Sequence, residues 1–144
     1  MYPSRKTISM WLLGVVVLAL SGNATAEGDP AIGVQLNKLE VDGDDCRAHL
    51  VLENGLGEAL ESFQLDMVVF DEDGIIQRRT VVEMAPLRAG SISVRAFRMT
   101  DTSCDSVGRI LINDINVCEG SEGAIDGCAD YVQVESLADV PLVR

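Results

Sequence analysis

The chain has 144 residues, of which 47% are hydrophobic, and it carries 23 acidic against 11 basic side chains, a formal charge of -12. A surface this acidic repels phosphate groups, because binding a nucleic acid or an anionic lipid headgroup requires clustered lysine and arginine. Nucleic acid and anionic membrane surfaces are therefore excluded as partners, and the length allows one domain with its own core.

The first 26 residues have the pattern of a cleavable export signal. Arg5 and Lys6 precede an apolar run over residues 10–20, and small residues follow up to Ala26. The run is shorter than the roughly 20 apolar residues of a bilayer span. We predict cleavage after Ala26, a mature chain from Glu27 without a membrane anchor, and a periplasmic location, with extracellular release as the alternative. A lysine replaces the second arginine of a twin-arginine signal, which favours general export.

From residue 32 onward, polar and apolar side chains alternate or form short β-branched runs, and turn residues separate the runs. This pattern is typical of β-strands. We predict an all-β domain over residues 27–144, an immunoglobulin-like antiparallel β-sandwich of about seven strands. The predicted strands cover residues 32–41, 46–53, 62–70, 75–84, 91–99, 109–118 and 130–137.

The stretch "VVFDEDGIIQRR", residues 68–79, places three acidic residues and a glycine between two of these strands. An EF-hand calcium loop needs glycine at its sixth position, glutamate at its twelfth, and flanking helices. Counted from Asp71, the glycine is the fourth residue and the twelfth is Val82. Asp73 and Gly74 instead match the central residues of a type I′ turn, so we predict a hairpin.

Residues 51–97 carry a series of turn residues in a recognisable order, namely Asn54, Gly55, Phe70, Asp71, Asp73, Gly74, Leu87 and Gly90. In this order the segment resembles FxLyD-type immunoglobulin-like modules of bacterial exported proteins. The resemblance covers less than half of the chain. It implies a fold and no activity.

The whole chain is also similar to small alphaproteobacterial periplasmic proteins of unassigned role. Their genes often lie near those of TolQ/ExbB-type and ExbD-type proton-channel subunits. This resemblance implies an accessory part in envelope energy transduction or transport, and it supplies no catalytic residue.

Four cysteines behind an export signal predict two disulfides, and four cysteines allow three pairings. Strand direction selects among them, because consecutive strands that reverse direction place alternate turns at the same end of the domain. Cys46 and Cys104 then share one end, whereas Cys118 and Cys128 flank a loop at the opposite end. We predict the pairs Cys46–Cys104 and Cys118–Cys128.

Groups for catalysis or cofactor binding are sparse. His49 is the single histidine, and no Cys-x-x-Cys pair is present, so we expect neither an enzyme nor a cofactor. Asp66 and Asp114 lie mid-strand, where they could meet across a sheet, although two solvent-facing acids are the ordinary arrangement. A hydrolase with a carboxylate site remains the second alternative.

The acidic turns are the first functional lead, because the predicted topology gathers them at one end. Their carboxylates either spread into water or hold a hard cation. A calcium-binding or small-ligand-binding protein is therefore the first alternative. The candidate cation cluster is Asp42, Asp44, Asp71, Asp73, Asp101 and Asp105, with Asp45 and Glu72 nearby.

Apolar surface is the second lead. Val68 and Phe70 lie on the strand face opposite Leu65, and the tail "ADVPLVR" carries Val140 and Leu142 without an evident strand partner. A contiguous apolar patch on a soluble protein usually marks an interaction site. Our leading hypothesis is a non-enzymatic periplasmic module that binds another envelope protein, by a sheet face or by strand addition at an edge.

Overall fold

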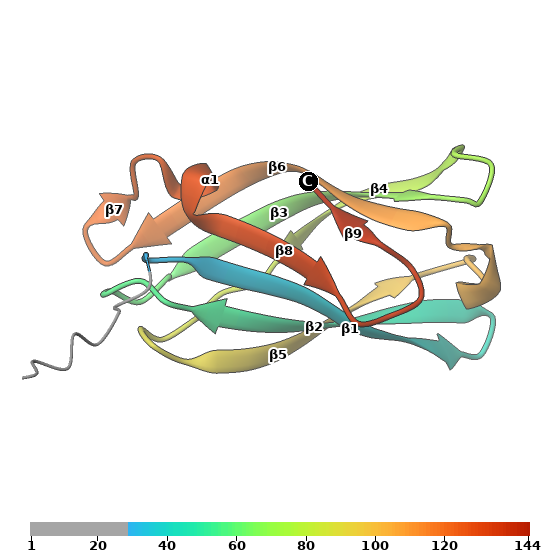
Figure 1. Cartoon of the computed structure of the whole chain (residues 1–144), viewed down its shortest axis with the longest axis horizontal. Helices are drawn as coiled ribbons and strands as arrows, with labels where there is room; N and C mark the ends of the chain where they lie inside the picture. Colours follow the sequence, from blue (N-terminus) through green and yellow to red (C-terminus); the bar gives the residue numbers. More distant parts are fainter. Residues whose placement is uncertain (1–28) are drawn as a thin grey trace, which may run out of the picture.

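Backbone hydrogen bonds pair the strands into two sheets, which face each other with their apolar sides (Figure 1). The computed structural model describes residues 29–144, so the predicted export signal lies outside the described residues. The first sheet has the order β5-β2-β1-β8, and the second has the order β4-β3-β6-β7, with β9 also paired to β6.

The strands of the first sheet are β1 (Ile32–Asp42), β2 (Asp45–Asn54), β5 (Ile92–Met99) and β8 (Val132–Ser136). Those of the second are β3 (Ser62–Phe70), β4 (Ile76–Glu83), β6 (Arg109–Gly120), β7 (Gly123–Ala124) and β9 (Leu142–Val143). Two short helical turns complete the fold, η1 (Cys104–Ser106) and α1 (Cys128–Tyr131).

The predicted all-β sandwich and its seven strands are confirmed, and β7 and β9 are additional short strands. The seven predicted strands reverse direction one after another, as predicted, but β3 and β4 lie in the opposite sheet from β2 and β5, so neighbours in sequence are not always neighbours in a sheet. The sheet is also not purely antiparallel. The C-terminal segment pairs in parallel twice, β8 with β1 and β9 with β6, and so connects the two sheets.

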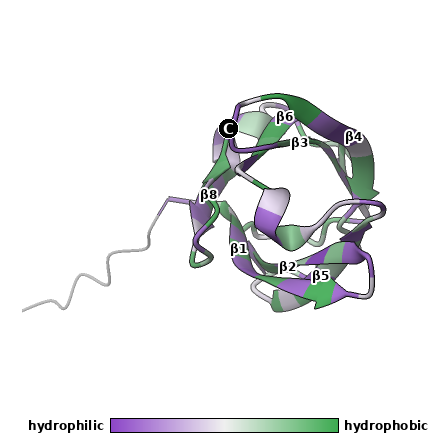
Figure 2. Ribbon diagram, turned by 90° about the vertical axis from the view of Figure 1, so that its right-hand side faces the viewer, coloured by the Kyte–Doolittle hydropathy of each residue, from purple (hydrophilic) through white to green (hydrophobic). Residues whose placement is uncertain are grey.

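The end-on view of Figure 2 shows the two sheets on opposite sides of the domain, and the buried apolar side chains form one core between their inner faces. On β3, Phe63, Leu65 and Met67 are fully buried, and on β2 Leu50 and Leu52 face them from the opposite sheet. These side chains are the period-two residues of each strand, so burial of one strand face accounts for the alternation in the sequence.

Both predicted disulfides are present, Cys46–Cys104 and Cys118–Cys128, and together they contain all four cysteines. Two structural disulfides indicate an oxidising, exported compartment. Within residues 29–144, none of the helices is sufficiently long and apolar to cross a membrane.

The hairpin between β3 and β4 is confirmed, but its predicted type I′ geometry is wrong. Gly74 has a positive φ of 80°, whereas Asp73 does not, and the Gly74 N–H donates to the Asp71 carbonyl oxygen (3.0 Å). The Asp71 carboxylate accepts the N–H groups of Asp73 (3.0 Å) and Ile75 (2.8 Å). This side-chain turn forms a longer loop, in which only the glycine takes the left-handed conformation.

Two inward-pointing arginines close the side of the sandwich where β4 and β5 are the edge strands. Arg78 of β4 donates to the carbonyl and hydroxyl oxygens of Thr100, both at 2.6 Å. Arg95 of β5 donates to the carbonyl oxygens of Met84 (3.1 Å) and Pro86 (2.9 Å). Each guanidinium therefore spans from one sheet to backbone groups that follow the edge strand of the other.

Candidate functional site

Three acidic turns, which connect β1 to β2, β3 to β4 and β5 to β6, lie at the same end of the sandwich, at the right in Figure 1, as the strand directions predict. Beside them the structure has an open groove of about 900 Å³. Four segments line it: the second half of β1, the β3–β4 turn, the segment from η1 to the start of β6, and the β8–β9 loop. The lining residues are Asn37, Lys38, Leu39, Val41, Asp71, Glu72, Gly74, Cys104, Asp105, Val107, Gly108, Arg109, Leu137, Ala138, Asp139, Val140 and Pro141.

The floor of the groove is an uncovered part of the inner face of β1. A bulge between Leu36 and Lys38 shifts the register, so Leu39 pairs with Ala48 and Val41 with Cys46, both of which face the core. Val41 therefore points to the inner side of its sheet, yet it is 70% exposed. The second sheet does not extend over this end of β1, and apolar surface that would otherwise be core is left open.

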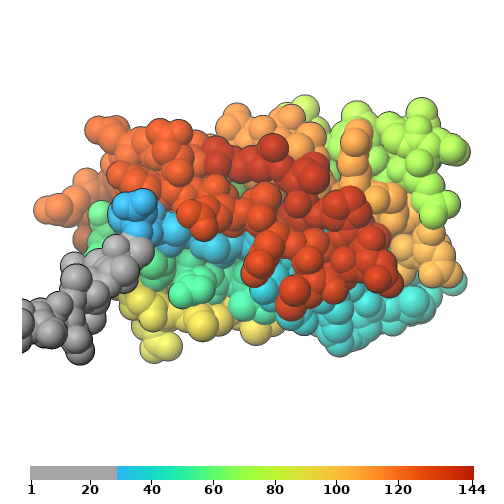
Figure 3. Space-filling model, viewed as in Figure 1, coloured from blue at the N-terminus to red at the C-terminus, as the bar shows by residue number. Residues whose placement is uncertain are grey.

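The β8–β9 loop, residues 137–141, forms one wall of the groove and is fastened to both sheets. The Leu137 N–H donates to the Leu36 carbonyl oxygen (2.8 Å), and the Pro141 carbonyl oxygen accepts the Ile110 N–H (3.0 Å). Inside the loop, the Ser136 hydroxyl donates to the Val140 carbonyl oxygen (2.6 Å). Figure 3 shows this C-terminal segment, in red, lying against β1 on the face of the molecule that carries the groove. A wall held at both ends is preorganised for binding.

The opposite wall depends on the close approach of two loops. The Gly108 N–H donates to the Phe70 carbonyl oxygen (2.8 Å), and a Cβ atom on Gly108 would lie 2.3 Å from the carbonyl oxygen of Asp71. Glycine is therefore required for the segment before β6 to pack against the β3–β4 turn. The Cys46–Cys104 disulfide fixes the same segment to β2.

Negative charge dominates the rim. The carboxylates of Glu72, Asp105 and Asp139 form no ion pair within residues 29–144. Of the two basic side chains of the lining, Lys38 pairs with Glu40, and the Arg109 guanidinium lies 4.4 Å from the centre of the Phe70 ring. The groove thus combines an apolar floor with an acidic rim, a combination suited to a chain segment with apolar and basic side chains.

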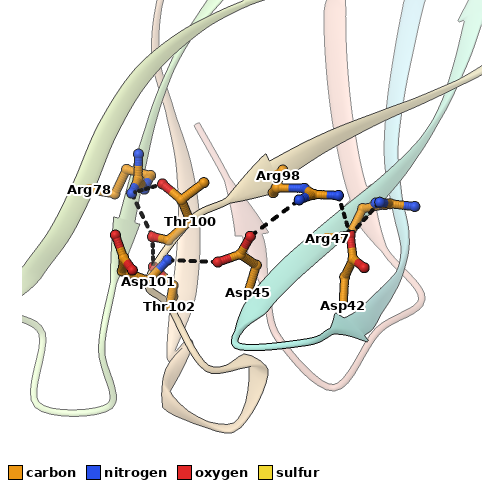
Figure 4. A network of polar contacts seen from close by, with 8 residues as sticks. All are labelled: Asp42, Asp45, Arg47, Arg78, Arg98, Thr100, Asp101 and Thr102. Atoms are coloured by element: carbon orange, nitrogen blue, oxygen red, sulfur yellow. Dashed lines mark hydrogen bonds and ion pairs between the residues drawn. The ribbon is translucent and has the colours of Figure 1, made fainter.

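Two further acidic residues of this end, Asp42 and Asp45, lie on the outer side of the first sheet, where arginines neutralise them (Figure 4). Arg47 of β2 and Arg98 of β5 are direct cross-strand neighbours, and both pair with the Asp42 carboxylate. Arg98 also reaches Asp45 at 3.4 Å, and Asp45 accepts the Asp101 N–H at 2.9 Å. The sequence suggested only solvated or cation-bound carboxylates, whereas Asp42 and Asp45 balance two neighbouring arginines.

The structure therefore divides the predicted cation cluster. Asp71 and Asp105 line the groove, Asp42 pairs with arginines, and the side chains of Asp44, Asp73 and Asp101 are exposed in the turns. In the part of the chain that the structure describes, no group of three histidine, cysteine, aspartate or glutamate side chains is placed to hold a metal ion.

We expect millimolar calcium to leave the thermal unfolding midpoint of the protein nearly unchanged. A ligand that binds only the folded state must raise that midpoint, and the carboxylates of Asp42 and Asp71 already have partners within the fold. The measurement is a melt with calcium, with chelator, and with magnesium at equal ionic strength. A calcium-specific rise of several degrees would contradict the expectation.

The predicted partner face of Val68, Phe70, Val140 and Leu142 does not form one exposed surface. Val68 is 5% exposed and Leu142 is 6% exposed. Leu142 is buried because β9 pairs with β6, a pairing that the short tail did not indicate. Phe70 is half-buried beneath Arg109, and Val140 is half-buried in the groove wall. Only Val140 therefore contributes to the candidate site.

Asp66 and Asp114 are direct cross-strand neighbours, as the sequence suggested, but Asp66 is not a solvent-facing acid. Its side chain is 2% exposed on the outer face of the second sheet, beneath Arg79, which is 66% exposed. Arg79 donates from Nε (2.9 Å) and Nη2 (2.8 Å), and Asn113 donates at 2.7 Å. These hydrogen bonds from Arg79, and then from Asn113, hold the pKa of Asp66 below its ordinary value.

His49 lies on the outer face of the other sheet, with its Nε2 atom 3.4 Å from a carboxylate oxygen of Glu40. His49 and Asp66 are thus separated by the whole thickness of the sandwich. The two groups cannot act on one substrate.

Replacing Arg79 with alanine is expected to lower stability near neutral pH and to matter less in acid. The lowered pKa of Asp66 means that its contribution is present above the unfolded-state pKa and is lost as pH falls through the folded-state value. The difference in unfolding midpoint between wild type and Arg79→Ala should therefore shrink below about pH 4. Denaturant melts across pH measure it, with exposed Arg88→Ala as the control. A difference that is independent of pH would contradict the assignment.

Several residues of the groove were not identified from the sequence, chiefly Val41, Leu137 and Asp139. Val41 depends on the bulge at Asn37, which no local pattern indicated. Asp139 lies in the apolar tail "ADVPLVR", and Leu137 directly precedes it. The lack of an evident strand partner for this tail was the sequence feature that could have indicated these two residues.

Comparison of the chain with protein-family models, with curated proteins and with solved structures found no match. The resemblance to FxLyD-type modules therefore remains a prediction from the turn residues.

Proposed function

We propose that the protein is a non-enzymatic periplasmic module that binds a segment of another envelope protein in the acidic groove. The observation that carries this proposal is the open inner face of β1, where Val41 is 70% exposed although it points toward the core side of its sheet. Leu137, on the facing wall, is 66% exposed. A bound segment that covered both side chains would extend the core of the sandwich.

The occupant we propose is an extended segment with apolar side chains flanked by lysine or arginine. Its apolar side chains would pack on Leu39, Val41 and Leu137. Its basic side chains would face Glu72, Asp105 and Asp139, the rim carboxylates without ion-pair partners among the described residues. Such rim charges act mainly on the association rate and on partner choice, so binding should weaken as salt rises.

The envelope location of this partner rests on the export signal and on the oxidising compartment that the two disulfides indicate. The similarity to small periplasmic proteins encoded near proton-channel subunits narrows the proposal to an accessory role in envelope energy transduction or transport. The acidic rim is compatible with a basic segment of such a complex.

Site-specific crosslinking in the native envelope tests the proposal. A photoreactive residue at Leu137 is expected to yield one dominant crosslinked protein. The same residue at Val81, 50% exposed on the outer face of the second sheet, is the matched control and should not yield it. Crosslinks of equal yield from both positions, or none from Leu137, would exclude the groove as the binding site.

Val41→Lys is expected to reduce the yield of this crosslink about tenfold, because losing a well-packed apolar contact at an interface usually lowers the affinity by about that factor. Asp105→Lys and Asp139→Lys should reduce it further at low salt. Asp126→Lys, an exposed acid on the loop between β7 and α1, changes the net charge equally and should have no effect. An equal reduction by Asp126→Lys would indicate a general charge effect instead of a site.

A further inference from the structure

The edge strand β5 has features that differ from those of the other sheet edges. It has eight residues, and its pairing with β2 contains no register shift. Its outward side chains are Ile92, Val94, Ala96 and Arg98, of which the first three are apolar. Ile92 is 67% exposed, Val94 is 62% exposed, and Ala96 is also exposed. A regular, apolar edge presents free backbone groups that readily pair with another strand.

The other edges carry the usual protective features. β8 has only five residues, and beyond β6 the second sheet is bounded by β7 and β9, which have two residues each. The outward face of β4 carries the charged side chains of Arg79 and Glu83. Short and charged edges resist strand addition, so β5 is the edge at which another strand can be added.

The direction of the free backbone groups of β5 follows from its pairing with β2. The Ser91 carbonyl oxygen accepts the Asn54 N–H (2.9 Å), so the backbone of Ser91 faces β2. Along an uninterrupted antiparallel strand, the N–H and C=O groups of successive residues point alternately to one side of the strand and to the other. The N–H and C=O groups of Ile92, Val94 and Ala96 therefore point to the free edge, on the residues whose side chains are exposed.

We propose that two copies of this chain associate by antiparallel pairing of their β5 strands, with Val94 opposite Val94 of the second copy on the two-fold axis. In this register Ile92 faces Ala96 of the other copy, and each facing pair exchanges two backbone hydrogen bonds. The outward pairs are all apolar. A shift that centres the pairing on Arg95 would instead place two arginines opposite each other, so charge repulsion disfavours that register.

The inner face of β5 allows this pairing without rearrangement. Arg95 points inward and already donates to the carbonyl oxygens of Met84 and Pro86. In the proposed register it faces Ser93 of the second copy. The groove is lined by other segments, so a dimer would carry two grooves and could bind a repeated partner more tightly than a monomer.

Sedimentation of the exported, disulfide-bonded protein tests the proposal. Wild type is expected to form a dimer at high micromolar concentration, and the dimer should strengthen with salt because the two acidic copies repel each other. Val94→Lys and Val94→Glu each place like charges opposite each other, and each should weaken association at least tenfold. An equimolar mixture of the two variants should restore the dimer, since residue 94 faces residue 94. Val81→Lys, on the outer face of the second sheet, should leave the dimer intact.

Three results would overturn self-association through β5: a wild-type protein that stays monomeric, a dimer that persists in both single variants, or a mixture that fails to restore it. Val94 is exposed, so both variants should keep the wild-type unfolding midpoint, and this is measured first. The groove crosslink from Leu137 reports separately on the proposed function, and its loss would leave the sedimentation result standing.

Discussion

Replacing both Cys46 and Cys104 with serine is expected to lower the free energy of unfolding by about 4 kcal/mol, a larger loss than breaking the second disulfide should cause. The Cys46–Cys104 disulfide joins residues that are 58 positions apart, so its removal releases a long loop in the unfolded chain. Replacing Cys118 and Cys128, which are 10 positions apart, should cost about 3 kcal/mol by the same relation. Both losses are large compared with the free energy of unfolding of a typical domain, which is roughly 5–15 kcal/mol.

Denaturant unfolding of the two double variants at neutral pH measures this difference. Double replacement avoids a leftover thiol, which would otherwise form new disulfides. The Cys46–Cys104 variant should also increase hydrogen exchange over residues 101–108, because the disulfide fastens one wall of the groove to β2. A larger loss from the Cys118–Cys128 variant would mean that closure of the unfolded chain does not set the order.

Replacing Asn54 with alanine is expected to cost about 3 kcal/mol, although the residue lies at the very end of β2. Its side chain is fully buried and makes three hydrogen bonds to backbone groups. It donates to the carbonyl oxygens of Glu58 (3.0 Å) and Leu87 (3.1 Å), and it accepts the Leu56 N–H (3.0 Å). Alanine would leave the buried Leu56 N–H without this acceptor and would remove a donor from the Glu58 and Leu87 carbonyl oxygens, of which that of Leu87 still accepts the Leu60 N–H.

The control is Asn116→Ala on the surface of β6, which should change the unfolding free energy by less than about 0.5 kcal/mol. Asn54→Asp should be at least as damaging as alanine, because aspartate removes both donors and adds a buried charge. A small effect of Asn54→Ala in denaturant unfolding would show that water replaces the lost contacts. Asn54 and Gly55 begin the series of turn residues that resembles FxLyD-type modules, and the contacts of Asn54 give the loop after β2 a physical role.

The strands, the placement of three acidic turns at one end, and both disulfides were predictable from the pattern of residues along the chain. These features depend on short-range rules. Alternation along residues such as Phe63, Leu65 and Met67 reports one buried face, and reversal of direction at each turn places Cys46 beside Cys104.

The polar and apolar groups that meet across the fold, by contrast, could be identified only from the folded structure. The bulge after Leu36 rotates Val41 into the groove, and the pairing of β9 with β6 buries Leu142. The balance of Asp42 by Arg98, far away in sequence, likewise requires β2 and β5 to lie side by side. Such contacts depend on sheet order and register, which are set by the packing of the whole core, and no local pattern records them.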